Sequence, residues 1–202
     1  MVVTRKEKPF DLAPKRTVSL QTDVQLVRLA QVDREAFVDL YNRYVDAVFR
    51  YCNRRLPLEA AEDATSITFL SAIRAISRFD PDRAGFRPWL FAIAHNAVID
   101  QLRARRHVQI ELVEIPAHEP GLDERAIAGE RKRLFRAALQ RLNADQQQVI
   151  HLRLASLTGP EIAEVMGKSP GAVRIIQYRA IKELRRLMAN HESLAADRTE
   201  ST

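Results

Sequence analysis

The residues whose types point most clearly to a binding function lie between positions 158 and 188, where the pattern predicts two helices. Most of them lie on the second of these helices. Arg and Gln side chains can read base edges in a major groove, and further cations can neutralise phosphates. An ordinary helical hairpin with a solvated basic face is the alternative. The predicted duplex-DNA contacts are Lys168, Ser169, Arg174, Gln177, Tyr178, Arg179 and Lys182.

Capping and turn residues predict how this basic helix is held. Thr158, followed three residues later by Glu161, is the pattern of a capping box at a helix N-terminus. Gly167 is suited to the left-handed residue that ends such a helix. Ser169 can cap the next helix, and Pro170 fits its first turn. Two helices separated by a short glycine turn predict a helix-turn-helix.

A second group of residues follows the loop FDPDRAG at 79–85, where aromatic and Arg side chains alternate. Such a mixture can stack unpaired bases and hold the backbone of single-stranded DNA. We expect Phe91 and Trp89 to lie in the core, and Phe86 and Arg87 to be exposed at the loop edge. This group predicts a second nucleic-acid contact.

The elements that must position these residues are helical. Apolar side chains recur at helical spacing over 34–56, 59–78, from Pro88 to about 102 and over 144–154, and glycines are few. We predict an all-α protein with two small helical domains joined by a flexible acidic linker. The expected divisions are a basic extension at 1–28, disordered, a helical domain at 29–107, the linker at 108–128, a helix-turn-helix domain at 129–190 and a polar tail at 191–202.

The charge distribution agrees with two separate nucleic-acid contacts. The 202-residue chain carries a net charge of +6, but residues 108–130 hold one Arg against six acidic residues. The segments on either side, 33–107 and 131–202, are both net positive. Two basic blocks around an acidic stretch are typical of nucleic-acid binding on both sides of a linker. A linker that is acidic without a binding role is the alternative.

Several function classes are poorly supported. No window approaches the ~18 apolar residues of a membrane span, and the charged N-terminus does not resemble a secretory signal, so we expect no membrane insertion and a cytoplasmic location. Cys52 has no partner for an internal disulfide and is expected in the core. No phosphate loop or nucleophile–base spacing occurs, so we predict no enzyme, cofactor or metal. The histidines are scattered: His95, His107, His118, His151 and His191.

Two blocks of sequence resemble the RNA polymerase sigma factors of the extracytoplasmic-function (ECF) type. The stretch AEDATSITFLSAIRAISRFDPDRAGFRPWLFAIAHNAVIDQLRARR at 61–106 is similar to sigma region 2, the promoter-melting domain. The stretch LQRLNADQQQVIHLRLASLTGPEIAEVMGKSPGAVRIIQYRAIKELRR is similar to region 4. The resemblance covers residues 33–107 and 130–188, in the family's order, with a linker between them.

The resemblance implies roles for individual residues. Capture of the minus-10 element is implied for the loop and the following helix, and reading of the minus-35 duplex for the helix that carries Arg174. Ser66 and Ile67 depart from the Gln-Glu pair that is usual in the polymerase-docking helix. Polymerase docking is implied for Glu62, Asp63, Thr68, Phe69 and Leu70, and minus-10 binding for Phe86, Arg87, Trp89, Asn96, Asp100 and Arg103.

As a member of this family the chain would bind core RNA polymerase, through the β′ clamp helices and the β flap, and promoter DNA. It would direct polymerase to promoters and help to melt the minus-10 element. An anti-sigma factor is the expected regulator. The rival interpretation is a stand-alone helix-turn-helix regulator, which leaves the aromatic loop unexplained.

Overall fold

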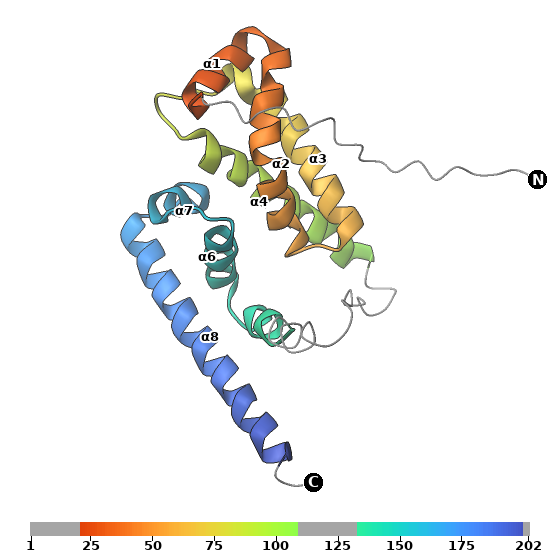
Figure 1. Cartoon of the computed structure of the whole chain (residues 1–202), viewed down its shortest axis with the longest axis vertical. Helices are drawn as coiled ribbons and strands as arrows, with labels where there is room; N and C mark the ends of the chain where they lie inside the picture. The colour runs from red at the N-terminus through yellow and green to blue at the C-terminus, as the bar shows by residue number, and fades with distance from the viewer. Residues whose placement is uncertain (1–20, 109–132, 200–202) are drawn as a thin grey trace, which may run out of the picture.

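The computed structural model describes residues 21–108 and 133–199, and within these ranges every regular element is a helix (Figure 1). The all-α prediction is therefore confirmed. Most of the predicted N-terminal extension and the predicted acidic linker lie outside the described residues. None of the described helices combines the length and the apolar character that crossing a membrane requires.

Helix α1 spans Asp23–Val32 and was not anticipated, because its start falls inside the stretch expected to be disordered. A capping box fixes this start: Thr22 accepts a hydrogen bond from the Gln25 amide, and the Gln25 side chain accepts one from the Thr22 amide at 2.9 Å. Gln31, near its end, donates to the carbonyls of Ile76 and Phe79 at 2.9 and 2.7 Å. Helix α1 therefore belongs to the N-terminal domain and supports its loop.

Three longer helices complete the N-terminal domain. Helix α2 spans Phe37–Asn53 after the 3₁₀ turn η1 at Arg34–Ala36. Helix α3 spans Leu58–Ala75, with Pro57 as its N-cap, and ends in the 3₁₀ turn η2 at Ile76–Arg78. Helix α4 spans Phe86–Val108. Helix α3 packs against both α2 and α4, which places the loop 79–85 at one end of the bundle.

The C-terminal domain contains a helical segment at 133–140, followed by three labelled helices. These are α6 at Ala144–Leu154, α7 at Gly159–Met166 and α8 at Pro170–Thr199. The prediction of a helix at 144–154 is confirmed residue for residue. The expectation that the last helix ends near 190 is wrong, since the backbone of α8 remains helical to Thr199.

Two apolar clusters hold these helices. The smaller one joins α6 to α8 and the 133–140 segment through Leu139, Leu142, Ile150, Ala180 and Leu184. The larger one fills the N-terminal bundle and continues into the C-terminal domain through Leu152 of α6, Leu157 of the connection and Ile162 of α7. Accordingly α7 packs against α4, whereas the length of α8 extends away from the bundle (Figure 1).

Candidate nucleic-acid interface

The helix-turn-helix forms as predicted, from the same capping residues. The Thr158 amide donates to the Glu161 carboxylate at 2.7 Å, and the Thr158 hydroxyl accepts from the Glu161 amide. Gly167 ends α7 at φ 60°, a left-handed conformation that favours glycine. Ser169 Oγ accepts from the Ala172 amide at 3.2 Å and so caps α8. The turn thus fixes the orientation of α8 relative to α7.

The outer face of α8 presents most of the residues predicted to contact duplex DNA. Arg174, Tyr178, Arg179 and Lys182 are exposed, and Gln177 is half-buried. Lys168, in the turn, is held by an ion pair with Asp145 of α6 at 3.1 Å. Inward, Val173 is buried against the larger cluster, which sets the rotation of α8 about its axis. The cations therefore face solvent together along one helix.

A cavity of about 440 Å³ lies where α8 passes the start of α6. Its lining includes Arg179 and Ile176 of α8 and residues 143–146 at the start of α6. Backbone amides at a helix N-terminus favour anions, although Asn143 already accepts from the Gln146 amide there. Together with Arg179, this edge can bind an anion such as a phosphate group.

Phe86 is not the exposed ring that we expected. It is 3% exposed and packs against Tyr44 and Phe79, with ring centroids at 5.6 and 6.0 Å. As the first residue of α4, it turns inward because three neighbouring rings surround it, and the third of these is Trp89 at 5.5 Å. Phe86 therefore supports the loop and is not available to stack on a base.

Trp89 and the loop instead border a cavity of about 280 Å³. The Trp89 ring is partly exposed and lies 4.6 Å from the ring of Phe79. Three charged side chains from η2 and the loop share the lining: Arg78, Asp80 and Arg83. Aromatic rings and guanidinium groups around one opening provide the stacking and backbone contacts that an unpaired base requires.

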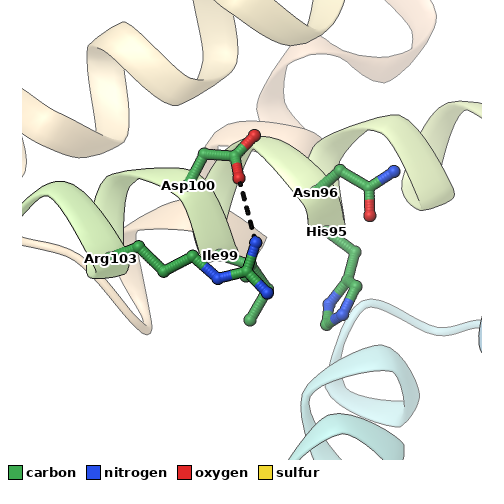
Figure 2. Close-up of a pocket in the computed structure, with 5 residues that line it drawn as sticks. All are labelled: His95, Asn96, Ile99, Asp100 and Arg103. Carbon is green, nitrogen blue, oxygen red and sulfur yellow. Dashed lines mark ion pairs between the residues drawn. The ribbon is translucent and has the colours of Figure 1, made fainter.

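Further along α4, Asn96, Asp100 and Arg103, for which the resemblance implies minus-10 binding, are exposed on one face (Figure 2). With His95 and Ile99 they line an open groove of about 520 Å³. Arg103 lies 3.7 Å from the Asp100 carboxylate, an exposed pair that contributes little to stability. Trp89 lies seven residues, about two turns, before Asn96, so both lie on the same side of α4 and can contact a single strand of DNA.

Arg87 is not exposed at the loop edge, which corrects a second expectation. Its guanidinium donates to the carbonyl of Ala155 at 3.0 Å and lies 3.6 Å from the carboxylate of Glu161. Both partners belong to the C-terminal domain. Arg87 therefore joins the two domains. It donates to a carbonyl at the end of α6 that has no partner within the helix, and it lies beside an acidic residue in the first turn of α7.

A polar cluster between the domains was missed by sequence reasoning. The Tyr51 hydroxyl lies 3.1 Å from Nδ1 of His95, and Arg55 lies 3.2 Å from the same nitrogen. His151 of α6 is 6% exposed, and its Nδ1 has no hydrogen-bond partner. Burial, with the charge of Arg55, lowers the pKa of both imidazoles to about 4. Both histidines are thus held neutral at the contact.

The residues implied in polymerase docking divide into two sets. Glu62, Asp63 and Leu70 are exposed along α3. Thr68 is fully buried and donates to the carbonyl of Ala64 at 2.6 Å, and the Phe69 ring packs 4.8 Å from the ring of Tyr41. Thr68 and Phe69 therefore shape α3 from behind and, contrary to expectation, present no surface to a partner.

The chain matches two family models. Residues 40–108 match sigma-70 region 2, and residues 132–184 match sigma-70 region 4. The ECF RNA polymerase sigma factor BldN of Streptomyces coelicolor is 37% identical, over 82% of this chain and 65% of BldN; this chain thus spans about two-thirds of BldN's length. The RNA polymerase sigma factor CarQ of Myxococcus xanthus is 34% identical, over 79% of this chain and 92% of CarQ.

A solved structure agrees with these matches. The sigma factor RpoE from Bartonella quintana, in complex with the anti-sigma factor NepR, superposes with a TM-score of 0.61 and 25% identity. The superposition covers 77% of this chain and 98% of that one. The ECF RNA polymerase sigma factor ShbA of Streptomyces griseus is 32% identical, over 79% of this chain and 91% of ShbA. With both sigma regions present in order and these relatives matched, the chain belongs to the extracytoplasmic-function sigma factors of the sigma-70 family.

Proposed function

We propose that this chain binds core RNA polymerase, directs it to specific promoters and helps to melt the minus-10 element. The observation that carries the proposal is the pairing, in one chain, of a duplex-reading helix with an aromatic cavity for an unpaired base. Helix α8 would read the minus-35 element as duplex DNA. The cavity beside Trp89, with the polar face of α4, would hold the opened minus-10 strand.

For polymerase docking we propose the exposed face of α3. Its side chains combine the acidic Glu62 and Asp63 with the apolar Ile67 and Leu70, which are 44% and 53% exposed. Large exposed apolar side chains beside charges are typical of a surface that a partner covers. This face would meet the β′ clamp helices, and the C-terminal domain would meet the β flap.

We also propose an anti-sigma factor as regulator, by extension from the RpoE–NepR complex. The packing of the C-terminal domain against the N-terminal bundle, which we call the closed arrangement, supports a regulated state. In it Arg87, a residue implied in minus-10 binding, is occupied by Ala155 and Glu161 of the other domain. The rival interpretation, a stand-alone regulator, is less supported because both family models match.

Co-elution with bacterial core RNA polymerase on size exclusion, beside a DNA-binding assay without polymerase, tests the proposal. Stoichiometric co-elution is expected, with weak and salt-sensitive DNA binding by the chain alone. Leu70→Asp, on the docking face of α3, should weaken co-elution, whereas Val38→Asp, at an exposed position of α2, should not. Tight sequence-specific binding to duplex DNA without polymerase association would instead establish the regulator.

Removal of the Trp89 ring should impair strand opening and spare the initial complex. Trp89→Ala withdraws the main stacking surface of the cavity, and base–aromatic stacking contributes about 1–3 kcal/mol per base. We therefore expect roughly a tenfold loss of permanganate reactivity at the minus-10 thymines, with duplex binding at low temperature unchanged. Trp89→Phe should recover part of the reactivity. Normal reactivity in Trp89→Ala would assign base capture elsewhere.

A further inference from the structure

The outer face of α8 contains one side chain that neither the fold nor charge neutralisation explains. After Pro170 and Gly171, seven residues of the first five turns face solvent, and five of them are cationic: Arg174, Ile175, Tyr178, Arg179, Lys182, Arg185 and Arg186. Tyr178 has a hydroxyl that can hydrogen-bond. Ile175 is 54% exposed and can neither hydrogen-bond nor carry charge. Covering this exposed isoleucine with another apolar group would be favourable.

The adjacent Ile176 shows what packing requires. Ile176 is partly buried, packs against the larger apolar cluster and borders the cavity between α6 and α8. Together with Val173 and Ala180 it belongs to the inward face of the helix. Ile175 lies one residue away, about 100° around the helix, and turns outward. Its side chain is therefore unnecessary for holding α8 in place.

Ile175 lies close to the turn of the helix-turn-helix. Helix α8 begins at Pro170, so Ile175 lies in the second turn, and the N-terminal part of a recognition helix is the part that reaches base edges. Arg174 precedes it and Arg179 follows one turn later on the same side. In a groove, Ile175 would lie on the bases while these guanidinium groups reach bases or phosphates beside it.

The major groove offers one apolar group, the 5-methyl group of thymine. We propose that Ile175 determines specificity by packing on a thymine methyl, so that the bound duplex must carry an A·T pair opposite this side chain. The inference rests on the proposed function, in which α8 reads duplex DNA. It adds a requirement for one base that the hydrogen-bonding residues of α8 do not impose.

Deoxyuridine provides the test, because it pairs as thymine does and lacks only the methyl group. Holoenzyme formed from the full chain and core polymerase would first select its preferred duplex from a random library. Each thymine of the minus-35 element is then replaced singly by deoxyuridine, and affinity is measured by competition. We expect one position at which the wild type loses about fourfold, the effect of withdrawing one methyl-sized apolar contact.

Three variants identify the side chain responsible. Ile175→Ala should bind the thymine and deoxyuridine duplexes equally at that position, with unchanged thermal stability because the side chain is exposed. Tyr178→Ala should retain the fourfold preference, and Arg174→Ala should weaken both duplexes alike. A preference that survives in Ile175→Ala, or no methyl-sensitive thymine at all, would overturn the inference and leave the proposed function intact. Failure of the holoenzyme to select any duplex would overturn both.

Discussion

Phe86→Ala is expected to lower the free energy of unfolding of the N-terminal domain by about 3–5 kcal/mol, the usual effect of truncating a buried phenylalanine. The ring is 3% exposed and contacts the rings of Tyr44, Phe79 and Trp89. These contacts tie the start of α4 to α2 and to the end of η2, so the loss also loosens the loop between them. Urea denaturation followed by far-ultraviolet circular dichroism measures the change.

Trp89→Ala is the matched comparison. Its ring is partly exposed and borders the cavity, so its removal should destabilise the domain clearly less than Phe86→Ala. Equal urea midpoints for Phe86→Ala and the wild type would mean that the ring cluster does not support the loop. The expected difference also has a practical meaning, because a transcription defect in Phe86→Ala would report on folding and not on base capture.

Acidification is expected to weaken the contact between the domains. Both His95 and His151 have a pKa of about 4 at the contact, against 6.5 when they are free in water. A lowered pKa means that the contact holds the neutral imidazole, so its stabilising effect is complete above pH 6.5 and is lost as the pH falls from 6.5 towards 4. For the buried His151 the full shift corresponds to about 3 kcal/mol.

Small-angle scattering between pH 7.5 and 5 measures the separation, and the radius of gyration should rise as the pH falls. Protonated His151 would face the guanidinium groups of Arg54 and Arg55, just after the end of α2, and protonated His95 would face Arg55. His151→Phe keeps an aromatic ring and removes the titration, so it should move the transition to lower pH. A transition at the same pH in His151→Phe would show that other groups control the contact.

Local features of the structure were predictable because each depends on residues close in sequence. The capping box at Thr158, the left-handed Gly167 and the bounds of α6 all follow from hydrogen bonds or backbone preferences within a few positions. Helix α1 was missed because it is short and lies beside a polar stretch. Its capping pair, Thr22 and Gln25, was the signal that could have located it.

Features that depend on distant partners were not predictable from the pattern. Arg87 has the type and position of a DNA contact, but Ala155 and Glu161, far along the chain, determine where its guanidinium lies. Phe69 lies on the buried side of α3, where its ring packs against Tyr41 of α2, and Thr68 beside it is fully buried. His95 and His151 are far apart in the sequence, and both come close to Arg55 only when α6 lies against the N-terminal bundle.

The apolar cluster shared by the two domains bears on how long the free chain survives in a cell. Separation of the domains exposes part of the surface that the segment from α6 to α7 contributes to it, including the surroundings of Leu157 and Ile162. Chaperones and proteases continuously sort chains that expose such surface. The closed form is therefore also the protected form, and abundance should follow the fraction of time that a chain spends closed or covered by a partner.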